Sequence, residues 1–187
     1  MNSSKTMRAD ARKNYGSLLA AARAAVELDG ADASLRDIAR KAGVGLGTLY
    51  RHFPTRESLL ETLLQDTWQG LTLKGQSLEE SDDPDDALVS WLRDFVEAIR
   101  MYRGLVNALA SAFADENSAL HASCVAMKAT GTALLSRAQT KGTVRADIEG
   151  ADLFALAGAL AWIGEQPSIN SRASHMFDVM VNAIFKP

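Results

Sequence analysis

Cysteine and histidine are scarce in this sequence of 187 residues, which contains one cysteine and three histidines. The single cysteine, Cys124, has no second thiol with which to form an intramolecular disulfide, so a disulfide-stapled secreted scaffold is excluded. So few cysteine and histidine side chains also leave little from which to build a metal cluster. We therefore expect neither a metal ion nor a cofactor.

Long apolar segments are also missing. The longest nearly uncharged apolar run covers residues 153–164, which is too short to span a bilayer. The first ten residues are polar and contain no apolar core of a signal peptide. Hydrophobic residues make up 47% and charged residues 23% of the chain, the proportions of an ordinary globular protein. These features predict a soluble, cytoplasmic protein.

Prolines are few, at positions 54, 84, 167 and 187, and they leave long segments without a helix breaker. Apolar residues recur at intervals of three and four, and sustained apolar–polar alternation is absent, so the sequence predicts an all-α fold. We expect about nine helices, with a linker at residues 75–86. In that linker Asp83 caps the next helix and Pro84 takes its first position. The predicted helices cover roughly residues 11–28, 34–42, 46–53, 55–74, 84–101, 105–113, 120–141, 147–163 and 172–185.

Charge is unevenly distributed along the chain. Residues 1–60 contain ten Lys and Arg against six Asp and Glu, a net charge of +4, whereas the remaining residues contain ten against 17, a net charge of −7. A basic N-terminal third on an acidic body indicates that one end of the molecule meets a polyanion.

Residues 34–53 read SLRDIARKAGVGLGTLYRHF and predict two short helices joined by a tight turn at residues 43–45. Gly43 supplies the positive φ that such a turn needs. The small Ala39 allows the second helix to pack closely across the first, and Leu49 and Phe53 contribute to a small core. This is helix-turn-helix geometry, in which the second helix enters the major groove of DNA.

The sequence LRDIARKAGVGLGTLYRHFPTRESLL, residues 35–60, resembles the DNA-binding motif of TetR-type transcriptional regulators. The resemblance implies an N-terminal three-helix helix-turn-helix domain, placed at residues 1–56, and a larger helical domain for effector binding and dimerisation at residues 57–187. The resemblance in sequence motif covers about residues 11–60. The rest of the chain is similar to these regulators only in its length and its helical pattern.

The resemblance also implies which side chains meet DNA. Tyr50 and Arg56 match positions that contact backbone phosphates, and Gly45 departs from the many members that have a longer side chain there. Because Gly45 cannot make that contact, the bases would be contacted by Leu46 and neighbouring side chains of the second helix. Leu46 is suited to an apolar contact with a thymine methyl group. The expected DNA-binding residues are Arg36, Leu46, Thr48, Tyr50, Arg51, His52 and Arg56.

Several of these side chains also have a purely structural interpretation. Tyr50 would then cover the small core, and His52 would be an exposed residue at the end of a helix. Arg36 and Arg51 would each only form an ion pair with a nearby carboxylate. We favour phosphate contact for Tyr50, while for Arg51 the two interpretations stay open.

Residues 153–164 are apolar on nearly every face and rich in alanine and glycine. Such a helix must be buried, and small residues let two helices approach closely. It is either the centre of the monomer core or, as we favour, part of an intermolecular four-helix bundle, because two half-sites require two copies. The expected interface residues are Phe154, Leu156, Leu160, Trp162, Ile163, Met176, Met180 and Ile184.

Several aromatic and polar side chains lie on the helices that, in similar proteins, enclose a pocket for the effector. A mostly apolar set with a few polar groups is typical of small-molecule sites, although each residue taken alone is more often part of the core. His121 is the best polar candidate in that region. The candidate pocket residues are Trp68, Trp91, Phe95, Tyr102, Phe113, His121 and Met127.

Two other classes of function would need different sequence features. No phosphate-cradling loop, zinc-protease HExxH, GxSxG elbow or CxxC motif occurs, so an enzyme is not expected. A helical bundle that binds a protein partner without contacting DNA remains the alternative. The expected function is therefore that of a dimeric repressor released from a palindromic operator by a small-molecule effector.

Overall fold

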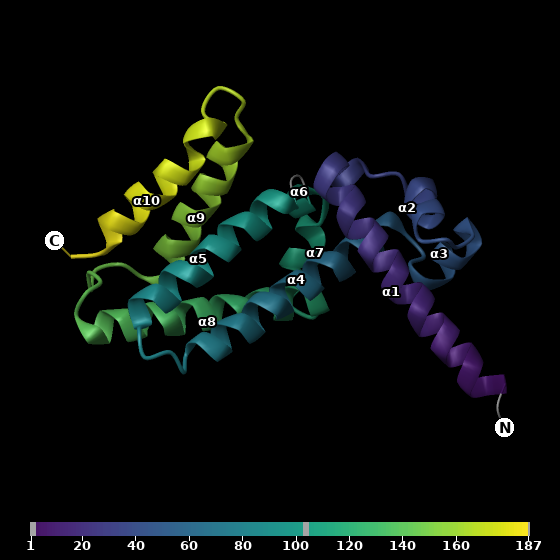
Figure 1. The fold of residues 1–187 in the computed structure, drawn as a ribbon, viewed down its shortest axis with the longest axis horizontal. Helices are drawn as coiled ribbons and strands as arrows, with labels where there is room; N and C mark the ends of the chain where they lie inside the picture. Colours follow the sequence, from purple (N-terminus) through teal and green to yellow (C-terminus); the bar gives the residue numbers. More distant parts are fainter. Residues whose placement is uncertain (1–2, 103–104, 187) are drawn as a thin grey trace. The chain divides into compact units, whose positions relative to one another are not determined.

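The computed structural model describes residues 3–102 and 105–186, without the side chains of residues 3–12, 106 and 107. This part of the chain contains ten α-helices and two 3-10 turns (Figure 1). It forms no β-strand beyond a single antiparallel bridge between Val144 and Phe185. The all-α prediction is confirmed. One helix more than expected is present because residues 105–113 form two short helices, α6 (Leu105–Ala108) and α7 (Ala110–Ala114).

The chain divides into two compact units. The first contains Met1–Leu64 and Met101–Asp115, and the second contains Gln65–Arg100 and Glu116–Pro187. Helix α4 (Arg56–Leu78) runs without a break from the first unit into the second. Sequence patterns did not assign residues 101–115 to the N-terminal unit, because nothing in that short apolar segment specifies its partner.

The first unit is built on α1 (Ser3–Asp29), which packs against α2 (Leu35–Lys41). Helix α3 (Leu46–His52) packs on α2 in turn, and the 3-10 turn η1 (Gly30–Asp32) connects α1 to α2. Burial of each large aliphatic side chain contributes about 1.5–3 kcal/mol, so this small unit has a core of its own. Its fully buried large side chains include Leu18, Ile38, Leu49, Leu59 and Leu63.

The second unit contains the rest of α4, α5 (Pro84–Met101), α8 (Ala119–Lys141), α9 (Gly150–Glu165), η2 (Asn170–Arg172) and α10 (Ala173–Ile184). Its centre is an aromatic cluster. Trp91 stacks on Phe95 with ring centroids 5.3 Å apart, and Phe154 meets Phe95 edge-on at 5.4 Å. The indole Nε1–H of Trp91 donates to the carbonyl of Leu71 at 2.9 Å, so this buried polar group is satisfied.

Glycine allows α8 to approach this cluster. A Cβ atom at Gly131 would lie 2.5 Å from the Trp91 ring, so no larger side chain fits there without displacing the indole. At Gly75 a Cβ atom would lie 2.2 Å from Thr130. Helix α4 therefore needs a glycine where it packs against α8. This close approach explains why Gly75 occurs inside a helix that continues to Leu78.

Three local predictions can be compared with the structure. The linker expected at residues 75–86 is shorter, because α4 extends to Leu78. The predicted cap of α5 is confirmed, since Asp83 accepts a hydrogen bond from the backbone N–H of Asp85 at 3.0 Å and α5 begins at Pro84. The predicted start of α9 at Asp147 is wrong, because α9 begins at Gly150 and Glu149 and Asp152 form its capping box. In the described part of the chain no helix is both long and apolar enough to cross a membrane.

Candidate nucleic-acid interface and apolar face

The backbone of the α2–α3 segment forms the turn that the sequence predicts. Ser34 caps α2, its Oγ accepting from the N–H of Asp37 at 3.3 Å. Gly43 has a φ of +70°, in the left-handed region that residues with a Cβ rarely occupy. The N–H of Val44 then donates to the carbonyl of Ala39 at 3.0 Å. These contacts fix the angle at which α3 leaves α2.

Helix α3 is held from beneath by apolar and aromatic contacts. Leu49 is fully buried and Phe53 is 3% exposed. The Tyr15 ring of α1 stacks on Phe53 with centroids 5.4 Å apart. A seven-residue helix is marginal in isolation, so this packing is what keeps α3 in place.

The outer side of α3 carries the side chains that the sequence predicts for DNA contact. Tyr50 is 46% exposed and Arg51 is exposed. Thr48 and Leu46 are half-buried on the same short helix. A phenol, a guanidinium and a hydroxyl are donors suited to phosphate oxygens and base edges.

His52 is partly engaged within the protein. Its ring meets Tyr15 edge-on with centroids 5.8 Å apart, and the side chain is half-buried. Tyr15 therefore orients the imidazole at the end of α3, so His52 is not the unconstrained helix-end residue of the structural interpretation.

Arg56 has a role that sequence patterns did not indicate. Its Nη1 donates to the carbonyl of Ala31 at 2.9 Å and to that of Ala33 at 2.6 Å. This side chain, at the first position of α4, thereby fastens α4 to the connection between α1 and α2. The same guanidinium retains other N–H donors, because arginine has five.

The remaining predicted cations are exposed. Among the residues that the structure describes, no ion pair joins Arg36 or Arg51 to a carboxylate. Arg40 differs, since it pairs with Asp37 at 2.7 Å within α2. Arg36 and Arg51 thus retain their full hydrogen-bonding capacity for an external ligand.

The candidate pocket residues are divided between the two units. Trp68, Trp91, Phe95 and Met127 are buried in the second unit, and His121 is half-buried there. Tyr102 and Phe113 belong to the first unit, where Arg23 donates to the Tyr102 hydroxyl at 2.9 Å. The aromatic rings of the second unit touch one another, Trp68 lying 6.1 Å from Phe95 between centroids.

One polar group in that aromatic cluster is not satisfied. The Nε1–H of Trp68 is buried and has no hydrogen-bond partner within the described residues, while the side chain is only 4% exposed. A buried donor without a partner costs about 1–3 kcal/mol. An acceptor from outside the chain would remove that cost. On α8, burial raises the pKa of the Cys124 thiol, as expected for an unreactive side chain.

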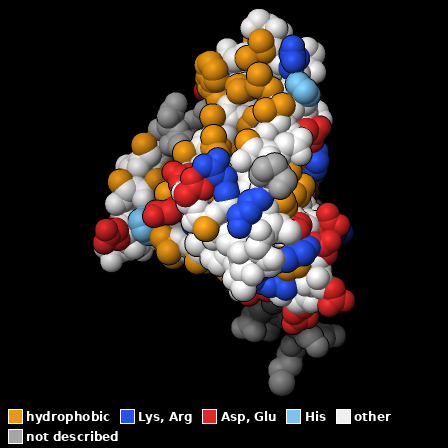
Figure 2. All heavy atoms as spheres, turned by 90° about the vertical axis from the view of Figure 1, so that its left-hand side faces the viewer, with side chains coloured by type: hydrophobic (Ala, Val, Ile, Leu, Met, Phe, Trp, Pro, Cys, Tyr) orange, Lys and Arg blue, Asp and Glu red, His pale blue; other side chains and the backbone are white. Residues whose placement is uncertain are grey.

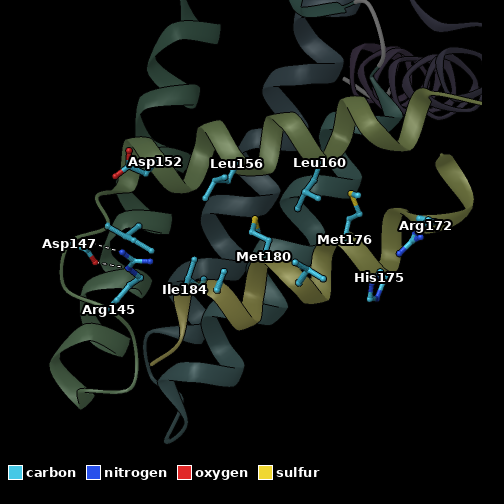
Figure 3. Close-up of a pocket in the computed structure, with 13 residues that line it drawn as sticks. Arg145, Asp147, Asp152, Leu156, Leu160, Arg172, His175, Met176, Met180 and Ile184 are labelled. Atoms are coloured by element: carbon cyan, nitrogen blue, oxygen red, sulfur yellow. Dashed lines mark hydrogen bonds and ion pairs between the residues drawn. The ribbon is translucent and has the colours of Figure 1, made fainter. Parts of the chain in front are cut away.

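Helices α9 and α10 form an apolar surface. A cavity of about 450 Å³ lies along them, and Leu156, Leu160, Met176, Met180 and Ile184 line it (Figure 3). Figure 2 shows hydrophobic side chains gathered over these helices in the upper part of the view. Leu156 is 42% exposed and Val179 is 53% exposed, so part of this surface is left uncovered by the protomer.

The other residues predicted for an interface lie elsewhere on α9. Phe154 packs inward against Trp91 and Phe95. Trp162 is 60% exposed and Ile163 is half-buried, and neither lines the cavity. Sequence reasoning missed the polar side chains at the cavity ends, because the apolar period of the helices does not indicate them. They are Arg145, Asp147, Asp152, Arg172 and His175.

A second groove, of about 470 Å³, runs between α4 and α8. Its lining is uncharged and includes Gln65, Gln69, Gln76 and Ser123. Helix α8 contributes mainly alanines to it. The groove is therefore suited to a neutral ligand that forms hydrogen bonds.

Comparisons with known proteins assign both parts of the chain. Residues 18–63 match the family model of bacterial regulatory proteins of the tetR family. Residues 83–184 match that of the C-terminal domain of SbtR-like transcriptional regulators. A comparison with curated proteins gives no significant match.

Solved structures agree with these matches. A TetR transcriptional regulator from Streptomyces coelicolor is 32% identical, with 91% of this chain and 97% of that chain covered and a TM-score of 0.72. A TetR regulatory protein from Mycobacterium vanbaalenii is also 32% identical, with 96% and 99% covered and a TM-score of 0.71. The ketosteroid transcriptional regulator of Mycobacterium tuberculosis shares the fold at 21% identity, with 94% and 96% covered and a TM-score of 0.64.

Proposed function

The chain belongs to the TetR family of transcriptional regulators, which bind DNA and are not enzymes, and we propose that it is a homodimeric repressor. It binds a palindromic operator and leaves it when a small-molecule effector binds. The observation that carries the proposal is the exposed Tyr50 and Arg51 on a short helix that Leu49 and Phe53 hold from beneath. Because the proposed operator is DNA, the proposed site of action of this protein is the cytoplasm.

Helix α3 is proposed as the recognition helix. Tyr50 and Arg36 contact phosphates, Arg51 contacts a phosphate or a base edge, and Leu46, Thr48 and His52 contact bases. Arg56 acts by positioning, since its two hydrogen bonds to the carbonyls of Ala31 and Ala33 hold α4 to the α1–α2 connection. Its remaining donors are available to a phosphate.

The proposed dimer buries the face of α9 and α10. Uncovered side chains as large as Leu156 and Val179 favour a protein partner, and dimerisation is typical of the family. The exposed Ala155 and Ala159 on α9 let a second helix approach closely. The partner-binding bundle stays as the alternative, but no described contact favours it, and the uncommitted Arg36 and Arg51 count against it.

The proposed effector site is the aromatic cluster around Trp68. Its unsatisfied Nε1–H would gain a partner from a ligand that presents a hydrogen-bond acceptor. Such a ligand releases DNA only if it binds the DNA-free state more tightly than the DNA-bound state. A thermal-shift screen of small apolar acceptors tests this. A compound that binds at this site is expected to raise the melting temperature of the wild type but not that of Trp68→Phe, which keeps an aromatic ring and lacks the N–H. Equal shifts in melting temperature for the wild type and the variant would place the ligand elsewhere.

The first experiment is a selection of bound sequences from random double-stranded DNA at two salt concentrations. We expect a palindrome whose affinity falls steeply as salt rises, because phosphate contacts release counterions. Absence of any motif, with no retention at low salt, would favour the partner-binding bundle. Recovery of a single half-site without symmetry would reject the dimer while keeping the DNA-binding function.

A further inference from the structure

The groove between α4 and α8 lies within the second unit and apart from the aromatic cluster, none of whose rings lines it. The two helices come close together at Gly75 and Thr130, and every lining residue of α8 precedes Thr130 in the chain. The groove, of about 470 Å³, therefore opens on the N-terminal side of that contact. Its volume falls within the range of about 300–1,000 Å³ that is usual for ligand sites.

One wall of the groove is a row of amide side chains. Gln65, Gln69 and Gln76 line it from α4, with Thr72 between them. Successive steps of four, three and four residues place these side chains on one face of the helix. Each amide group has both donors and an acceptor, so this wall can form paired hydrogen bonds along its length.

The chain itself does not use these amides. Outside the groove, Gln139 donates to the carbonyls of Arg145 and Ile148, and Gln166 donates to that of Trp162. The three glutamines of the groove form no side-chain hydrogen bond within the residues that the structure describes. The glutamines elsewhere thus stabilise the fold, whereas those in the groove keep their hydrogen-bonding groups for an external partner.

The opposite wall is low and uncharged. Ala119, Ala122 and Ala126 of α8 line it with methyl groups alone, so a ligand can lie close to the helix. No charged side chain lines either wall of the groove. A charged group would lose hydration there without gaining an ion pair, which indicates a neutral ligand.

Two hydroxyl groups add acceptors to the groove. The Oγ of Ser123, a residue only 8% exposed, donates to the carbonyl of Leu120 at 2.9 Å. The Oγ1 of Thr72 donates to the carbonyl of Trp68 at 2.9 Å. Because both hydroxyl protons are committed within the chain, these oxygen atoms meet a ligand as acceptors. The groove therefore favours a ligand that carries N–H donors.

The spacing of the glutamines matches the repeat of an extended peptide. Gln65 and Gln69 are about 6 Å apart along the axis of α4, and alternate residues of an extended chain are about 6.6 Å apart. From Gln65 to Gln76 the axial distance is about 16.5 Å, which is the length of about five extended residues. A pentapeptide that lies along α4 therefore brings a backbone amide to each glutamine.

We propose that the groove between α4 and α8 binds a short neutral peptide in an extended conformation, with Gln65, Gln69 and Gln76 each paired to one of its backbone amides. In each pair the glutamine NH₂ donates to a peptide carbonyl and the glutamine carbonyl accepts from a peptide N–H. Other peptide N–H groups donate to the hydroxyl oxygens of Thr72 and Ser123. This site is additional to the proposed effector site at Trp68 and does not depend on it.

The test uses the full chain and acetyl-pentaalanine amide, a neutral peptide whose methyl side chains suit the alanine wall. Selective isotopic labelling of glutamine allows NMR to follow each side-chain NH₂ group, and replacement of each glutamine in turn assigns the signals. We expect saturable shifts of the signals from the three glutamines of the groove, with a dissociation constant below about 1 mM. The signals of Gln139 and Gln166 are expected not to move.

A matched ligand tests the chemistry of recognition. Acetyl-pentasarcosine amide is an isomer of the first peptide, in which a methyl group on each residue's nitrogen replaces the N–H donor. We expect it to bind at least about tenfold more weakly, because it cannot donate to the glutamine carbonyls or the two hydroxyls. Equal affinity for the two peptides would show that backbone N–H groups are not recognised and would overturn the proposal.

Variants of the exposed residues locate the site. Gln69→Ala is expected to weaken binding of acetyl-pentaalanine amide about tenfold, since it removes one pair of hydrogen bonds. Ala122→Leu is expected to abolish the shifts, because the larger side chain fills the groove. Ala129→Leu, at an exposed position of the same helix outside the groove, is the matched control and binds like the wild type. Unmoved signals of Gln139 and Gln166 show that each variant is folded.

Two results would overturn the proposal. The first is the absence of shifts at a peptide concentration of about 5 mM, where a site of the expected affinity is mostly occupied. The second is a set of shifts that persists in Ala122→Leu. Both are measured without DNA, so they leave the proposed operator binding untouched, and a failed operator selection would in turn leave the peptide site untouched.

Discussion

Helix α3 and the face of α9 and α10 are both proposed as surfaces for a partner, but one protomer completes them to different degrees. The polar side chains of α3 stand on a core that the same chain supplies, with Leu49 and Phe53 buried beneath it. On α9 and α10 the large apolar side chains Leu156 and Val179 are themselves exposed. A surface that contacts a polyanion needs a rigid support, whereas an apolar surface needs a second surface to cover it.

A charge placed on the apolar face of α9 and α10 is expected to disrupt the proposed dimer. We expect Leu156→Asp to yield a folded monomer, because the position is 42% exposed in the protomer. Loss of simultaneous binding to two half-sites lowers operator affinity by about 100-fold or more. Sedimentation measures the first effect and fluorescence anisotropy with an operator duplex measures the second. A monomer that keeps full operator affinity would contradict the proposed dimeric mode of binding.

The next largest effect comes from α3 itself. Tyr50→Ala and Arg51→Ala are each expected to weaken operator binding about tenfold, since a contact of this kind contributes about 1–3 kcal/mol. Both side chains are exposed, so the free energy of unfolding stays close to that of the wild type. Lys186→Ala, an exposed cation outside the first unit, serves as the control in the same anisotropy assay. Equal affinities for all four proteins would remove α3 from the interface.

A smaller effect concerns the support of α3. Gly43→Ala is expected to lower the free energy of unfolding by about 1–2 kcal/mol, because alanine is strained at a φ of +70°. Gly45→Ala is the matched control two residues away, where φ is −70° and no atom lies within 4 Å of the added Cβ. Urea unfolding distinguishes them. A loss of equal size in both variants would show that the turn is not under conformational constraint.

The smallest expected effect concerns an ion-pair cluster that belongs to neither surface. Lys141 binds Asp83 at 3.0 Å and Asp85 at 2.8 Å, and its hydrogen bond lowers the pKa of Asp83 below the usual 3.8. A lowered pKa stabilises the fold above pH 3.8, and that stabilisation is lost as pH falls through the pKa of the folded state.

We therefore expect Lys141→Met to reduce the urea midpoint slightly at neutral pH and to leave it unchanged well below pH 3. Lys128→Met, on the same helix and without an ion pair among the described residues, should follow the wild type at every pH. A pH-independent deficit in Lys141→Met would assign the effect to lost packing of its aliphatic stem instead.

Predictability from the sequence also differed between the two surfaces. The turn at Gly43 and the burial of Leu49 depend on residues close together in the chain, so their pattern alone indicated them. The role of Arg56 was not predictable, because its acceptors are the carbonyls of Ala31 and Ala33, about 25 residues away in the sequence and without a side-chain signature.

The apolar face was predicted only in part. The helical period identified Leu156, Met176 and Met180, but it placed Phe154 on the same surface although that ring packs inward on Trp91. A helix that is apolar on nearly every face gives no indication of which side meets the core of its own chain. No sequence pattern could predict that the Trp68 N–H lacks a hydrogen-bond partner, because this depends on every residue that surrounds the indole in the folded chain.

The unbroken course of α4 through both units has a consequence for protein engineering. Each residue added to an α-helix turns everything beyond it by about 100° and moves it by about 1.5 Å. Chimeras that exchange the second unit between relatives must therefore join inside α4, near the boundary at Leu64 and Gln65, and must conserve the number of residues in that helix. A junction that adds or removes one residue would leave both units folded and still rotate one unit relative to the other.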